Sequence, residues 1–104
     1  MRTFSLMGSI GVTTKLTSTD TAQALPATIL TCPTSGRPLL AATFYVETKS
    51  IRIGIGAVPT QAGLGPLLAD GDVLRVVGRK NLEGFQFISA ASGQHGSMQV
   101  VPEY

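Results

Sequence analysis

The sequence has little charge, one cysteine, one histidine and no tryptophan. Lysine, arginine, aspartate and glutamate make up 13% of its 104 residues, about half the share usual for soluble domains. A single cysteine, Cys32, excludes an internal disulfide, and a single histidine, His95, excludes ligand sets built from several histidines. We therefore expect no metal and no cofactor, and the lone thiol is typical of folding in a reducing cytoplasm.

Long apolar runs are also missing. No stretch approaches the roughly 20 residues that a helix needs to cross a bilayer. Residues 1–8 contain Arg2 and several apolar residues, but Thr3, Ser5 and Gly8 interrupt them, so no secretory hydrophobic region is present. The sequence predicts a soluble protein without a membrane partner.

The charges that are present lie scattered along the chain. Eight basic and six acidic residues give a formal charge of +2, and Arg79-Lys80 is the only adjacent basic pair. No ladder of aromatic residues accompanies that pair, so no nucleic-acid partner is expected. A mean hydropathy of +0.27 implies a surface of Thr, Ser, Gly, Gln and apolar atoms, which suits a protein packed into an assembly.

Apolar residues that alternate with period two predict short β-strands. The segments are 10–16, 39–46, 51–55, 73–77, 85–89 and 98–101, with weaker candidates at 3–7, 27–32 and 64–68. Segment 39–46 is apolar on both faces and predicts a strand covered on both sides, whereas Phe85 and Phe87 share one inward face. Glycine or proline interrupts nearly every helical period, so helix should be minor.

Turn-forming residues separate these segments at 17–20, 33–36, 59–63, 70–72, 81–84 and 93–96. Asp70-Gly71 indicates a tight turn before segment 73–77, because glycine adopts positive φ freely. No linker or internal repeat divides the chain. We therefore expect an all-β fold, with residues 1–104 forming one small antiparallel β-sandwich or jelly-roll-like domain of about eight short strands.

Two residues have the chemistry of a nucleophile and its base. A nearby His95 would lower the effective pKa of the Cys32 thiol and support thiolate attack. However, Cys32 precedes Pro33 at the end of an apolar segment, where cysteine usually serves as a small buried hydrophobe. The sequence favours that structural role, and we predict no catalytic residue and no enzyme activity.

Glycines and paired carboxylates give two further candidate motifs. Gly54-Ile55-Gly56 begins like a dinucleotide fingerprint, but Pro59 follows where a helix should start. These glycines fit better a strand edge or bulge that another backbone approaches closely. Asp70 and Asp72 lack neighbouring oxygen donors at the spacing of a calcium loop, so a turn explains them. We predict no cofactor-binding residue, no metal ligand and no small-molecule substrate.

The aromatic residues leave a binding module open as an alternative. They are Phe4, Phe44, Tyr45, Phe85, Phe87 and Tyr104. Most of them alternate with polar residues, which is typical of core positions. A carbohydrate or host-surface binding module would instead require an exposed aromatic cluster on one face.

Four segments, in order, resemble a group of small tailed-bacteriophage virion proteins. They are residues 21–26 (Thr-Ala-Gln-Ala-Leu-Pro), 51–60, 65–72 and 87–94. The group has a similar entry motif, a glycine-containing strand with its turn, a Gly-x-Pro-Leu turn and an alanine-rich strand ending in Gly-Gln. The similarity spans about residues 17–101, and it implies a β-sandwich structural protein of the virion.

The resemblance and the composition together give the functional expectation. We expect a non-enzymatic bacteriophage virion protein on the capsid surface, made in the host bacterial cytoplasm, that acts as a decoration or cement subunit. Its expected partners are the major capsid protein and copies of itself, most simply as a homo-trimer, since so few charges leave apolar surface to hide. A tail, neck or fibre component is the structural alternative.

Overall fold

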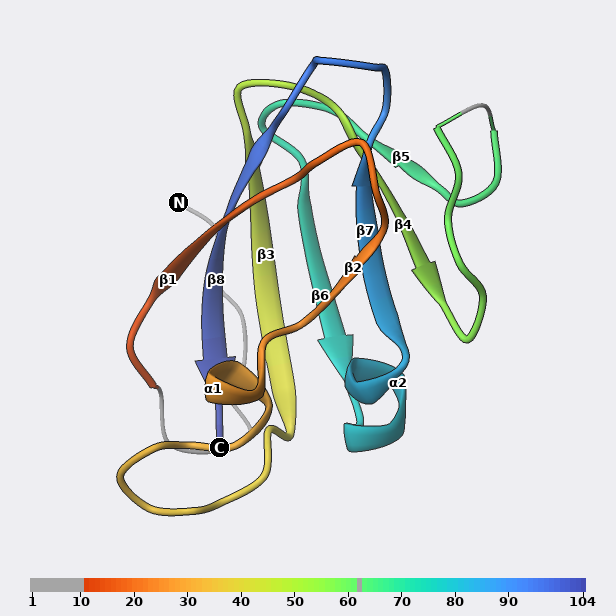
Figure 1. The fold of residues 1–104 in the computed structure, drawn as a ribbon. Helices are drawn as coiled ribbons and strands as arrows, with labels where there is room; N and C mark the ends of the chain where they lie inside the picture. Colours follow the sequence, from red (N-terminus) through yellow and green to blue (C-terminus); the bar gives the residue numbers. More distant parts are fainter. Residues whose placement is uncertain (1–10, 62) are drawn as a thin grey trace.

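The computed structural model describes residues 11–61 and 63–104, which form two packed antiparallel sheets (Figure 1). The first sheet has the order β1 (Thr14–Thr17), β8 (Ser97–Glu103), β3 (Ala41–Glu47) and β6 (Val73–Val77). The second has the order β2 (Gln23–Ala24), β7 (Phe85–Ser89), β4 (Ile51–Ile55) and β5 (Leu67–Leu68). Two short helices, α1 (Ala27–Leu30) and α2 (Arg79–Glu83), lie in the connections.

The strands pair in a nested order. β1 lies beside β8, β2 beside β7, β3 beside β6 and β4 beside β5, and every pair is antiparallel. The β1–β8 and β3–β6 pairs lie in the first sheet, and the β2–β7 and β4–β5 pairs lie in the second. Successive pairs therefore alternate between the two sheets, and this arrangement is a jelly roll. The prediction of an all-β sandwich with eight short strands is confirmed.

The core lies between the two sheets. On β3 the inward residues are Ala42, Phe44 and Val46, and their neighbours on β8 and β6 include Val100 and Val76. The facing side of the second sheet contributes Ile51, Ile53, Phe85 and Phe87, all buried. Phe44 and Phe85 stack across the interface with ring centroids 4.5 Å apart and planes 4° from parallel. The predicted inward orientation of Phe85 and Phe87 is therefore confirmed.

The outer face of β3 is covered as well. Thr43 and Glu103 face away from the core but are almost completely buried. Glu103 Oε1 and Oε2 accept hydrogen bonds from Arg75 Nη2 at 2.9 and 3.1 Å. One face of β3 packs against the core, and the ion pair between Arg75 and Glu103 covers the other face. Residues 41–44 are therefore buried on both faces, as the apolar pattern predicted.

The strand predicted at 27–32 is wrong, because residues 27–30 form helix α1. Pro26 precedes the helix, and its carbonyl oxygen accepts hydrogen bonds from the N–H groups of Ile29 and Leu30 at 3.0 and 3.1 Å. This turn buries Ile29, whose carbonyl accepts a 2.7 Å hydrogen bond from Tyr104 Oη. β-branched residues favour a strand locally, and tertiary burial overrides that preference here.

Other boundaries also differ from the prediction. The turn expected at 81–84 is largely helix α2, which buries Leu82. β2 was missed because two residues show no period, and β5 occupies only the end of segment 64–68. β1 begins at Thr14, and the strand expected at 3–7 lies outside the described residues.

Gly71 provides a test of the turn that precedes β6. Its φ is +91°, and no heavy atom lies within 4 Å of the position a Cβ would occupy, so the constraint is conformational. Gly71→Val should lower the free energy of unfolding by about 1–3 kcal/mol, measured by chemical denaturation. Ala69→Val is the control, since Ala69 is exposed in the same turn and is not among the residues with positive φ. It should change stability by less than about 0.5 kcal/mol, and an equal loss in both variants would contradict the argument.

Candidate functional site

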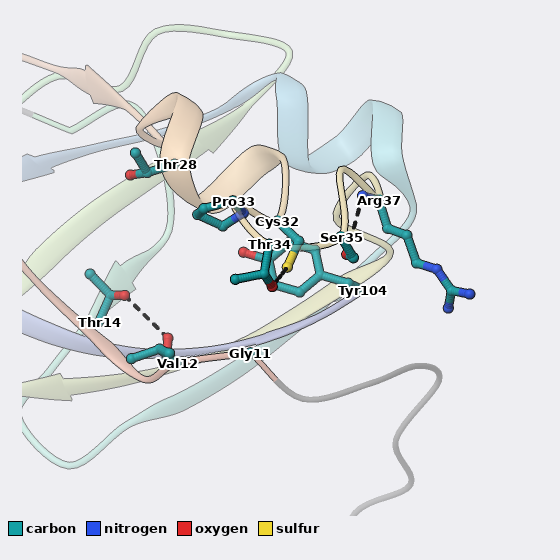
Figure 2. Close-up of a pocket in the computed structure, with 10 residues that line it drawn as sticks. All are labelled: Gly11, Val12, Thr14, Thr28, Cys32, Pro33, Thr34, Ser35, Arg37 and Tyr104. Carbon is teal, nitrogen blue, oxygen red and sulfur yellow. Dashed lines mark hydrogen bonds between the residues drawn. The ribbon is translucent and has the colours of Figure 1, made fainter.

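A cleft lies at one end of the sandwich, between the start of β1, helix α1 and the loop that follows α1 (Figure 2). Its volume is about 880 Å³. The lining residues are Gly11, Val12, Thr14, Thr28, Cys32, Pro33, Thr34, Ser35, Arg37 and Tyr104. The lining is a mixture of hydroxyl groups and apolar surface, with one guanidinium group and one thiol.

Cys32 is the reactive group in this cleft. Its Sγ lies 3.3 Å from Thr34 Oγ1, and hydrogen bonds from the hydroxyls of Ser35 and Thr34 lower the pKa of the thiol to about 6. Hydroxyl donors stabilise the thiolate more than the thiol, which is why the pKa falls. Cys32 was predicted to be a small buried hydrophobe, and its side chain does pack against the hydrophobic core, but it is only partly buried.

The pair Cys32 and His95 is not assembled by the fold. His95 lies in the turn between β7 and β8, at the opposite end of the sandwich from the loop that carries Cys32 (Figure 1). No histidine lines the cleft. The thiolate therefore has no imidazole base beside it. The fold gives Cys32 and His95 separate local roles and does not form a nucleophile–base pair from them.

The lowered pKa predicts the reactivity of Cys32. Alkylation by iodoacetamide should reach half its maximal rate near pH 6, because the thiolate is the attacking form. Thr34→Val combined with Ser35→Ala removes the two donors and should move this midpoint up toward the ordinary value of 9.0. Alkylation reactions quenched at fixed times and analysed by mass spectrometry give the rate at each pH, and hence both midpoints. A midpoint above about pH 8 in the unchanged protein would rule out the stabilised thiolate.

Ser18, Ser89 and His95 form a hydrogen-bonded cluster that the sequence did not reveal. Ser89 Oγ lies 3.2 Å from His95 Nδ1 and 2.8 Å from Ser18 Oγ, and the N–H of Gly96 donates to Ser18 Oγ at 2.8 Å. Ser18 lies 71 residues before Ser89, so spacing gives no signal for this contact. Both serine side chains are fully buried, so neither hydroxyl reaches a substrate. The cluster ties the end of β1 to the turn between β7 and β8.

Asp20 joins three loops beside that cluster. Its Oδ1 accepts hydrogen bonds from the N–H of Gly93 and from Gln61 Nε2, both at 3.0 Å. The Gly93 hydrogen bond, followed by that of Gln61, holds the pKa of the Asp20 carboxyl below its usual value. A second, shallower cleft on the outer face of the second sheet is lined in part by Asp20, Gln61 and Ile88.

Lowering the pH should weaken the hydrogen bonds that Asp20 accepts from Gly93 and Gln61. Because the folded-state pKa of Asp20 is lowered, its contribution to stability is present above the unfolded value of 3.8 and is lost as the pH falls through the folded value. Above about pH 4 the unchanged protein should melt at a higher temperature than Asp20→Asn, and the two should converge at lower pH. Thermal melting across this range tests the prediction. Asp70→Asn, at an exposed turn position, serves as the control and should show no such convergence.

The remaining motifs have local structural roles. Asp72 Oδ2 accepts the N–H of Ala69 at 2.8 Å, as expected for a turn. Within residues 11–61 and 63–104, no group of three or more His, Cys, Asp or Glu side chains is placed to hold a metal ion. A Cβ on Gly54 would overlap the carbonyl oxygen of Ala57. The close backbone approach predicted at this glycine is therefore made by the chain itself.

The most distinctive surface feature is the connection from β4 to β5. We call residues 55–61 and 63–67 the apolar arm. Ile55, Val58, Leu64 and Leu67 on this arm are exposed by 45, 57, 55 and 50%. The sequence contains no charged residue from position 53 to position 69. The absence of charge can be read from the sequence, but only the structure shows which of these side chains face the solvent.

Comparison with protein-family models finds no matching family, and comparisons with curated proteins and with solved structures find no match either. In the part of the chain that the structure describes, no helix is long and apolar enough to span a membrane. The fold defines the class as a small jelly-roll β-sandwich, and because a fold hosts many functions, function has to be argued from the surface.

Proposed function

We propose that this chain is a non-enzymatic structural protein of a tailed-bacteriophage virion, acting on the capsid surface as a decoration or cement subunit. Its partners in this proposal are the major capsid protein and copies of itself. Four segments that resemble small virion proteins support the proposal, and two of them, 51–60 and 65–72, build β4, β5 and most of the apolar arm. Viral capsid domains are among the known uses of the jelly roll, although that architecture also serves lectins.

The observation that carries the proposal is the apolar arm. Val58 and Leu64 are exposed to solvent on a segment without charge, and several exposed large apolar side chains on one short segment are a feature of protein interaction sites. A subunit that binds a shell in many copies needs such a surface and does not need a catalytic centre. The groups with reactive chemistry, Cys32 and His95, lie at opposite ends of the sandwich (Figure 1).

A carbohydrate-binding module is less well supported. Phe44, Phe85 and Phe87 are core residues, and Tyr104 is buried with its hydroxyl bonded to Ile29. Among the described residues, only Tyr45 is an aromatic side chain that is not buried, and it is half-buried on β3. An aromatic platform for sugar stacking is therefore missing from residues 11–61 and 63–104.

Copy number separates decoration from a tail, neck or fibre role. A decoration subunit repeats with the capsid lattice, whereas a neck or tail-tip subunit follows the low symmetry of a single vertex. Mass spectrometry of purified virions, scaled to the major capsid protein, should find copies comparable to those of the capsid subunit. A few to a dozen copies per particle would favour the tail or neck, and complete absence would overturn the virion proposal.

Two substitutions test the non-enzymatic part of the proposal. Cys32→Ala and His95→Ala should leave attachment to the particle unchanged, because neither side chain lies on the apolar arm. Attachment should also survive moderate salt, since a chain with a net charge of +2 relies mainly on apolar and hydrogen-bonded contacts. Co-sedimentation of each variant with particles measures both effects. Loss of a particle-level activity in both variants, with the fold preserved, would favour an enzyme.

A further inference from the structure

Three segments meet at the end of the sandwich that carries the turn between β7 and β8 (Figure 1). The N–H of Ser18 donates to the Gly96 carbonyl oxygen at 2.8 Å, and the N–H of Ser89 donates to the Thr19 carbonyl oxygen at 2.9 Å. His95 is exposed in the turn, whereas Ser18 and Ser89 are completely buried. One ring nitrogen of an exposed histidine therefore contacts a chain of two buried hydroxyl groups.

Counting donors and acceptors assigns the proton of Ser18. A serine hydroxyl has one proton to donate, and a buried hydroxyl needs an acceptor for it. The contact between Gly96 and Ser18 uses Ser18 Oγ as the acceptor, because the N–H of Gly96 is the donor. Among the residues that the structure describes, the other hydrogen-bonding neighbour of Ser18 Oγ is Ser89 Oγ. Ser18 therefore donates to Ser89.

The same count fixes the protonation state of His95. Ser89 Oγ accepts the Ser18 proton and has its own proton to donate. Its remaining hydrogen-bonding neighbour in the described part of the chain is His95 Nδ1, at 3.2 Å. Nδ1 is therefore an acceptor, so the imidazole is neutral and carries its proton on Nε2. We call Ser18, Ser89 and His95 the serine relay, because their hydrogen bonds run in one direction.

Protonation of Nδ1 would reverse the last hydrogen bond of the serine relay. An imidazolium ring has an N–H on both nitrogens and accepts no hydrogen bond. Ser89 would then donate back to Ser18, and Ser18 would keep a buried proton without an acceptor. A buried hydroxyl without an acceptor is unfavourable. Separation of the segments, which lets water reach the hydroxyl, relieves that cost.

Charged groups on the surrounding elements also act on the imidazole. Asp20, which follows β1, interacts electrostatically with His95 and favours a proton on the ring. Glu47, at the end of β3, and Lys49, in the turn that follows, are exposed and carry opposite charges. Asp20 is exposed as well, so water and salt screen its attraction. The serine relay acts through buried hydrogen bonds, which solvent does not screen.

We propose that the serine relay is a proton-sensitive latch. With His95 neutral, it holds the connection between β1 and β2 against the turn between β7 and β8, and protonation of His95 releases the two segments. The release falls between about pH 7 and pH 5, the range in which histidine side chains gain a proton. The latch operates within one protomer, whatever the protein binds on the virion.

Nitrogen chemical shifts of the imidazole test the direction of the serine relay. His95 is the only histidine, so its ring signals in isotope-labelled protein are unambiguous. At about pH 7.5 the shifts should show a proton on Nε2 and none on Nδ1. A proton on Nδ1 at this pH would exclude the relay, because Ser89 would then lack an acceptor.

Amide hydrogen exchange of the unchanged protein tests the latch. Protection factors, which correct for the intrinsic effect of pH, should fall about tenfold between pH 7.5 and pH 5.5 at the N–H groups of Ser18, Ser89 and Gly96, because loss of a buried acceptor favours local opening. The N–H of Gly78 bonds to the Leu40 carbonyl oxygen at 2.8 Å near the opposite end and should keep its protection. Constant protection at the first three groups would overturn the latch.

Two variants separate His95 from a general effect of acid. His95→Asn retains an acceptor, Oδ1, in place of Nδ1 but does not gain a proton, so its protection factors should be equal at both pH values. Ser89→Ala removes the middle of the serine relay and should lower protection at both pH values, with no further fall in acid. Circular dichroism verifies the fold of each variant. A full loss of protection in acid by His95→Asn would refute the assignment of the latch to His95.

Discussion

The stacked contact between Phe44 and Phe85 is the interaction on which the rest of the structure depends. Phe44 lies at the middle of β3 in one sheet, and Phe85 begins β7 in the other. Parallel rings 4.5 Å apart contribute about 0.5–1.5 kcal/mol beyond their buried area. Successive strand pairs of this jelly roll lie in alternate sheets, so many of the connecting loops cross from one sheet to the other. The packing distance between the sheets therefore sets the span of these loops.

The positions of those loops separate the reactive groups of the chain. One end of the sandwich carries Cys32 in a cleft, and the other carries His95, Ser89 and Ser18, joined by hydrogen bonds. A nucleophile and a base at opposite ends do not form a catalytic pair. The apolar arm connects β4 to the edge strand β5 of the second sheet (Figure 1), and four of its large apolar side chains are exposed. These positions are the reason we propose an interaction role.

Strand prediction succeeded where alternation was long and bounded by turns. Segments 51–55, 73–77 and 85–89 are strands over the predicted residues. Prediction failed for α1, because Thr28 and Ile29 favour a strand locally while Pro26 and the burial of Ile29 produce a helical turn. β2 has only two residues, and no period is visible in so short a segment.

The sequence by itself determined the all-β class, the approximate number of strands, the turn at Gly71 and the uncharged segment 53–69, because period, turn chemistry and charge are local properties. Only the tertiary structure decided the jelly-roll order, the hydroxyl groups that lower the Cys32 pKa, and which apolar residues of the arm stay in water. Each of these depends on distances between residues whose separation in space the chain order does not fix. Leu64 and Leu82 look equally apolar in sequence, yet helix α2 packs Leu82 into the core, whereas Leu64 stays exposed.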